Sequence, residues 1–296
     1  MFKYDGDVTL DALVHAAVAI GMLVVVPLGL RLVDAPGLAG TRRWWPAAAV
    51  PGAGSLWLPR GPLAVTLAAL YALGALILAG HALARVRRSL RPQRSRRLAA
   101  TEVAVLTALT CPLVAAGSLV AERAGYALGG FRLDVLTLTV AHFHFAGFAA
   151  ALVAGLVCRA VPGRRAGRLA ALSVPAGTAL VFAGYLVGAL ATGDAGEVVQ
   201  AAGALVLTAG MWTVGWLTWR DLRPAVADRS TRALLATSAA VLVVTMLLAL
   251  DWAVGEAVGV PHLSVRAMAA THGLGNALGF ALCGVAAWYR LRPLPL

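Results

Sequence analysis

The sequence predicts an all-α protein, a polytopic transmembrane helix bundle that forms a single domain over residues 1–296. The composition is 60% hydrophobic and 13% charged, with a mean hydropathy of +0.82, which leaves too little polar surface for a soluble protein. Apolar runs also recur along the chain, most of them close to the roughly 20 residues that cross about 30 Å of hydrocarbon. In order, these are Val8–Leu32, the shorter Trp44–Leu58, Leu63–Ala84, Leu98–Val120, Val135–Val161, Leu169–Leu190, Val198–Trp219, Ala233–Leu250 and Met268–Trp288.

The first two runs need separate arguments. Val8–Leu32 follows Asp5 and Asp7 and lacks a basic leading region, so we expect a retained first span and not a cleaved signal peptide. Trp44–Leu58 is short and contains Pro51-Gly52, so a kinked span, a tilted span or a re-entrant segment would each fit it.

Small residues mark the last run as a packing helix. Gly273, Gly275 and Gly279 allow a neighbouring helix to approach closely. We therefore expect them to lie in helix-to-helix contacts.

The distribution of charge predicts the orientation, because cytoplasmic loops hold an excess of Lys and Arg. Nine spans, with the N-terminus outside and the C-terminus inside, place all but five of the 25 basic residues on the inner side. This predicts a multi-pass protein of a bacterial-type cytoplasmic membrane whose partner is the lipid bilayer. The net charge of +12 follows from this orientation, and no nucleic-acid partner is expected. The five basic residues left outside are Lys3, Arg60, Arg123, Arg132 and Arg266.

Histidines inside the spans are the strongest functional signal. His142 and His144 lie in one run, and His15 and His272 lie in the first and last runs. Ionisable groups in hydrocarbon are costly and mark functional sites. At 1.5 Å per residue, all four lie roughly 10–15 Å below the outer surface. We therefore predict one polar cavity in the outer half of the membrane. The simplest alternative for each histidine is a hydrogen bond between helices.

The spacing within each helix assigns possible partners. Asp11 and His15 are four residues apart on one face, so the carboxylate can orient the imidazole. His272 and Asn276 have the same spacing. His142 and His144 project about 200° apart on a regular helix. We expect one of this pair to face the cavity and the other to face a neighbouring helix.

Two runs carry a family resemblance. Ala-His-Phe-His-Phe-Ala-Gly-Phe at 141–148 and His-Gly-Leu-Gly-Asn-Ala-Leu-Gly-Phe at 272–280 resemble the YndJ-like bacterial membrane proteins, over most of the chain. That family is often labelled as transporters. The resemblance implies the membrane fold and the positions of the two motifs.

A second resemblance is local. Val-Ala-His-Phe-His-Phe at 140–145 is similar to the helix of haem–copper oxidases in which one His ligates each of two haems on opposite faces. The chain lacks the His-Pro-Glu-Val-Tyr motif and the adjacent His-His copper ligands of those proteins, and it is shorter. Haem is therefore not the expected cofactor.

The leading hypothesis is an intramembrane enzyme acting on a lipophilic small molecule by acid/base chemistry, such as isomerisation or cyclisation. It needs no cofactor. The expected acid or base is His142 or His144, with His272 polarising the substrate. The expected substrate-binding residues are Asn276, His15 and Asp11.

Three other functions remain open: a transporter, a metal protein, and an accessory or assembly protein. A small-molecule or proton-coupled transporter would place its site at interrupted helices, such as those containing Pro51, Pro112 or Pro175. A metal protein would draw zinc or non-haem iron ligands from the histidines. An accessory or assembly protein would need no site. The candidate metal ligands are His15, His142, His144 and His272.

Overall fold

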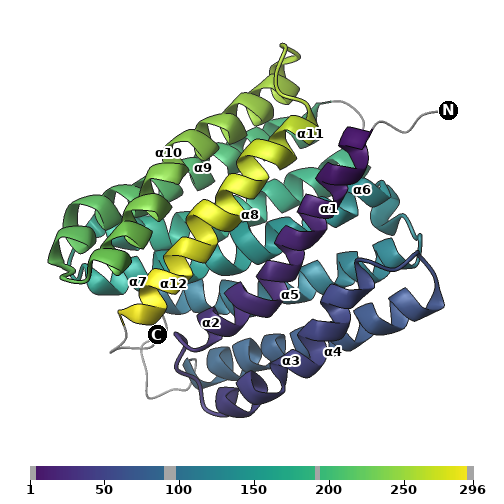
Figure 1. The fold of residues 1–296 in the computed structure, drawn as a ribbon. Helices are drawn as coiled ribbons and strands as arrows, with labels where there is room; N and C mark the ends of the chain where they lie inside the picture. The colour runs from purple at the N-terminus through teal and green to yellow at the C-terminus, as the bar shows by residue number, and fades with distance from the viewer. Residues whose placement is uncertain (1–4, 90–97, 191–193, 292–296) are drawn as a thin grey trace.

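The computed structural model describes residues 5–89, 98–190 and 194–291, and these residues form nine helical rods and no strand (Figure 1). Five rods are single α-helices, and a sixth, α9, ends in two short turns. Three are composite, and we call them the N-terminal, central and C-terminal rods. The N-terminal rod is α1 (Asp5–Ile20), η1 (Gly21–Val25) and α2 (Val26–Leu30); the central rod is α6 (Leu133–His142), η3 (Phe143–Ala149) and α7 (Ala150–Ala160); the C-terminal rod is α11 (Val265–Met268), η6 (Ala269–Gly273), η7 (Gly275–Leu282) and α12 (Cys283–Arg290).

The remaining rods flank these three. They are α3 (Leu38–Ser55), α4 (Pro62–Ser89), α5 (Ala100–Arg123), α8 (Arg165–Leu190), α9 (Ala195–Leu217) with η4 (Thr218–Leu222) and η5 (Arg223–Ala225), and α10 (Arg229–Val258); a short 3-10 turn, η2 (Leu128–Gly130), precedes the central rod.

The polytopic helical bundle predicted from composition is confirmed. Seven of the described rods are long and apolar enough to cross a membrane; α3 and the C-terminal rod are the other two. Large apolar side chains, among them Leu73, Ile77, Val244 and Leu247, are more than half exposed. Such faces are stable when lipid covers them.

The short segment with Pro51-Gly52 forms one helix, α3, which runs through Pro46 and Pro51 without a break. It begins at Leu38, before the predicted Trp44, and its 18 residues extend about 27 Å. It packs along α4, where Gly52 faces the Tyr71 ring (Figure 1).

The central rod is the most buried part of the bundle. Within its apolar window 83% of the residues are buried, against 28% to 56% in the six other candidate spans. The N-terminal and C-terminal rods both pack against it. A polar side chain on this rod is therefore surrounded by protein.

Glycines set the close contacts of the C-terminal rod. A Cβ on Gly275 would lie 2.9 Å from Cγ2 of Thr245, and one on Gly279 would lie 2.7 Å from Cγ2 of Val241. Both therefore lie in the predicted contacts, with α10 as the neighbour. Gly273 does not, because a Cβ there would meet only a backbone oxygen 3.7 Å away.

Candidate functional site

The three rods that carry the predicted site histidines pack against one another. Helix α1 contacts α6, η1 contacts η3, and η7 contacts both η1 and η3. Figure 1 shows the N-terminal rod in purple beside the C-terminal rod in yellow. The packing thus brings together three segments that are distant in the sequence.

Each of the three rods also contains a π-helical segment: η1, η3, and η6 with η7. In the rest of the described chain the π-helical segment is η4, at the end of α9. Such segments are rare and occur frequently at functional sites. They also change the face on which later side chains lie.

His144 is fully buried at the start of η3, and both of its ring nitrogens are used. Nδ1 lies 2.7 Å from the Val140 carbonyl oxygen, and Nε2 lies 2.6 Å from the Tyr71 hydroxyl on α4. Because a carbonyl only accepts, Nδ1 donates, and Nε2 accepts from the phenol. The ring is thus a neutral link between the central rod and α4.

Tyr71 is the partner that sequence reasoning missed. It is fully buried, its ring stacks on His144 with centroids 5.8 Å apart, and Trp45 packs edge-on against it. A tyrosine within an apolar span was the available signal, since a buried hydroxyl requires a hydrogen-bond partner.

His142 differs from His144 in its surroundings. It is the last residue of α6, its side chain is partly buried, and its Nε2 is buried without a hydrogen-bond partner. His272 on the C-terminal rod lies close enough to act on it electrostatically. His144 thus bonds a neighbouring helix, as expected for one member of the pair, whereas the cavity expected for the other member stays a prediction.

His272 is held by one side chain and one backbone carbonyl. Its Nδ1 donates to the Thr245 carbonyl oxygen at 2.7 Å, which leaves Nε2 to accept from the Asn276 amide nitrogen at 3.2 Å. The Thr245 hydroxyl in turn donates to Oδ1 of Asn276 at 2.9 Å. The predicted contact between His272 and Asn276 is present, and α10 completes it.

His15 and Asp11 lie in a different environment. The His15 ring packs edge-on against Trp57, with centroids 5.8 Å apart. Asp11 is exposed and acts on His15 electrostatically, and no hydrogen bond joins these two described residues. Glu122 and Arg123 act on His15 as well. The structure thus groups His142, His272 and Asn276, and it places His15 beside a separate charged cluster.

That cluster closes the end of the bundle where α3 stops. Glu122 is 1% exposed and pairs with Arg60 at 2.9 Å and with Arg123. Arg123 also donates to the carbonyl oxygens of Ser55 and Leu58, both at 3.2 Å. Glu122 and Arg123 can remain charged while buried because each is paired with an opposite charge.

The described residues do not form a set of ligands for the metal-protein alternative. Among residues 5–89, 98–190 and 194–291, no three His, Cys, Asp or Glu side chains are grouped so as to hold a metal ion.

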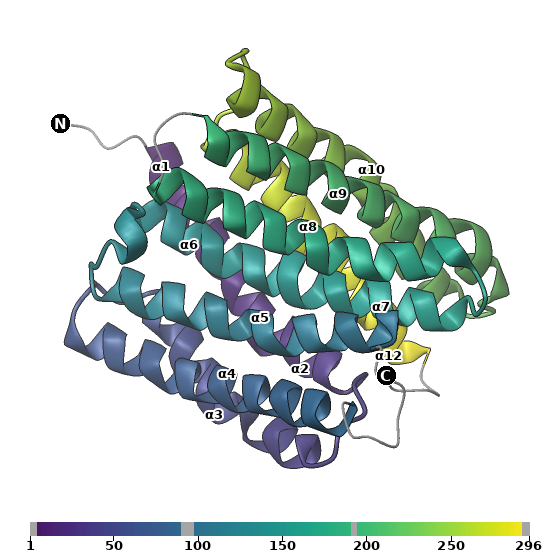
Figure 2. The ribbon, with the colours of Figure 1, turned by 180° about the vertical axis from the view of Figure 1, so that it is seen from behind.

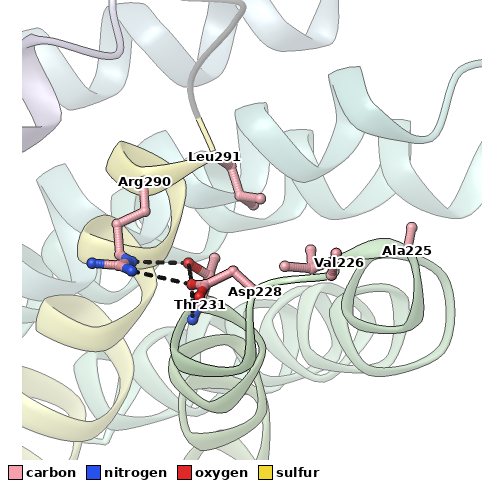
Figure 3. A pocket seen from close by; sticks show the side chains of 7 residues that line it. Ala225, Val226, Asp228, Thr231, Arg290 and Leu291 are labelled. Carbon is pink, nitrogen blue, oxygen red and sulfur yellow. Dashed lines mark hydrogen bonds and ion pairs between the residues drawn. The ribbon is translucent and has the colours of Figure 1, made fainter.

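Two recesses lie at the ends of the bundle, and neither is lined by His142, His144 or His272. One is lined by Val226, Asp228, Thr231 and Arg290, and the side chains of the last three bond to one another (Figure 3). Hydrogen bonds from Thr231 and Arg290 lower the pKa of the Asp228 carboxyl to about 2. The other is lined by Glu256 and His262, which pair at 2.6 Å.

The fold and these contacts define a polytopic helical membrane protein with a polar contact between buried rods. The chain belongs to the YndJ-like protein family, whose model matches residues 16–280. The match includes both histidine motifs and begins after His15. Neither a curated protein nor a solved structure matches the chain.

Proposed function

We propose that this protein is an intramembrane enzyme that moves a proton on a lipophilic small molecule, in an isomerisation or cyclisation, with His142 as the acid or base. The observation that carries the proposal is the buried, unpartnered Nε2 of His142 beside His272. We place the enzyme in a bacterial-type cytoplasmic membrane.

An unpaired buried polar atom costs about 1–3 kcal/mol relative to a bonded one. His144 and His272 have their nitrogens bonded within the protein, so they avoid this cost. His142 bears it, and a substrate polar group at Nε2 would remove it. An imidazole at this position can both accept and return a proton.

The neighbouring residues support this role. Asn276 and Thr245 fix the tautomer of His272, so that its Nε2 presents a lone pair and the amide of Asn276 can exchange partners with a substrate. His144 is assigned to the scaffold. His15 and Asp11, at the outer charged cluster, are assigned to the entry side and not to the reacting atoms.

The substrate class follows from the location. We expect a site inside a membrane bundle to take apolar molecules, because these partition into the surrounding hydrocarbon. A proton shift conserves mass, because the base removes one proton from the substrate and one proton, which can exchange with solvent, is added at another position of the same molecule. It therefore requires no redox cofactor.

The test compares lipid extracts of cells that express the protein with extracts of cells that do not. The expected product has the mass of its precursor and a different chromatographic retention. In D₂O it should gain deuterium at the position that receives the proton. Identical extracts from the two strains, in both solvents, would contradict the proposal.

A proton-coupled transporter is the second candidate, and the π-helical segments of the three packed rods favour it, since transporters bind at interrupted helices. The helices that contain Pro51, Pro112 and Pro175 run without a break, so the interruptions lie elsewhere than expected. Proteoliposomes with an internal pH dye distinguish the two: a proton flux that requires His142 supports transport.

A further inference from the structure

Two tryptophan–arginine stacks lie where α9 continues into η4 and η5, next to the start of α8. We propose that this surface binds the phosphate of an anionic phospholipid. The guanidinium carbon of Arg220 lies 5.0 Å from the ring centroid of Trp216, and that of Arg223 lies 4.0 Å from the ring centroid of Trp219. We call these four residues the stacked pairs.

The stacked pairs present guanidinium edges to a ligand. A guanidinium that lies over an aromatic face keeps its N–H groups in its own plane, where they can bind a phosphate through two parallel hydrogen bonds. Nε of Arg223 is buried and has no hydrogen-bond partner among the described residues. The arginine is thus oriented by its ring, and a donor remains unused.

Acidic side chains do not neutralise this surface. Asp221 pairs with Arg164 at 3.1 Å and lies 4.0 Å from Arg220. Arg165 and Arg168, which follow Arg164 at the start of α8, are exposed. One carboxylate therefore faces several guanidinium groups, and the local excess of positive charge attracts an anion.

The tryptophans indicate that the anion is part of a lipid. Trp216 and Trp219 are each 47% exposed on an apolar helix, and each arginine follows its tryptophan by four residues toward the end of the rod. Figure 2 shows α8 and α9 side by side on the face opposite the N-terminal and C-terminal rods. A phospholipid would place its phosphate at the arginines and its acyl chains along the indoles.

The experiment is native mass spectrometry of the detergent-solubilised full chain, titrated with phosphatidylglycerol or phosphatidylcholine. The wild type should retain phosphatidylglycerol more strongly. R220Q/R223Q should weaken this retention about 30-fold, because each arginine that contacts the bound phosphate contributes roughly a fivefold effect, and an arginine away from the bound lipid does not. R220K/R223K should also weaken it, since lysine keeps the charge and lacks the planar fork.

The matched control is R87Q/R88Q in the last turn of α4, which removes the same charge from a helix end. It should leave retention unchanged. Equal loss in the control and in R220Q/R223Q, full retention in R220K/R223K, or competition by inorganic phosphate as effective as that by the lipid would each overturn the proposal. Monodisperse elution of every variant confirms that the folded protein is compared.

Discussion

The Tyr71 hydroxyl donates a hydrogen bond to Nε2 of His144, with 2.6 Å between oxygen and nitrogen, and so joins α4 to the π-helical segment of the central rod. Replacing Tyr71 by Phe would leave this nitrogen buried and unpaired. We expect the variant to lose about 1–3 kcal/mol of unfolding free energy. Thermal unfolding in detergent measures the loss.

Tyr126→Phe is the control, because Tyr126 is 62% exposed and should be neutral. If Tyr71→Phe were as stable as the wild type, His144 would not be the structural link described above.

Much of the fold was predictable from the sequence because hydrocarbon imposes length and composition on each span. The π-helical segments were not predictable, since they depend on how side chains of different rods fit together. The bonds of His144 and Glu122 were also missed, because their partners Tyr71 and Arg60 are distant in the sequence. The pair of His272 and Asn276 was predicted because both lie on one helix.

Gly147 provides a second test of packing around η3. A Cβ at this position would lie 2.7 Å from the sulfur of Cys111, so Gly147→Ala should cost about 1–3 kcal/mol. At Gly117 a Cβ would meet nothing within 4 Å, and Ala there should be neutral or stabilising by up to about 1 kcal/mol. Equal unfolding temperatures for the two variants would contradict the packing.

Asp228 gives a pH dependence. Its side chain accepts from the backbone and hydroxyl of Thr231 at the start of α10 and pairs with Arg290. Its pKa, about 2 when folded, is lower than the roughly 3.9 of an unfolded chain. The contribution to stability is therefore complete above about pH 5 and declines as the pH falls toward 2. Asp228→Asn should lose this part of the acid sensitivity; an unchanged acid profile would refute the assignment.

The orientation remains a prediction that cysteine labelling can test. The excess of arginine on one side predicts that Arg165 faces the cytoplasm and that Asp194 and Glu256 face outward. An impermeant thiol reagent added outside should modify cysteines at 194 and 256 and spare one at 165. The same prediction places Arg91, which lies outside the described residues, on the inner side. Labelling at 165 from outside would reverse the topology.

The most direct measurement of the central proposal is product formed per folded molecule in His142→Ala. We expect it to fall by roughly 10²–10⁴-fold at a normal yield of folded protein, as loss of a general acid or base predicts. His81→Ala is the control and should retain activity, because the His81 ring bonds Thr41 in the C-terminal part of α4. His142→Ala with undiminished product per folded molecule would contradict the account.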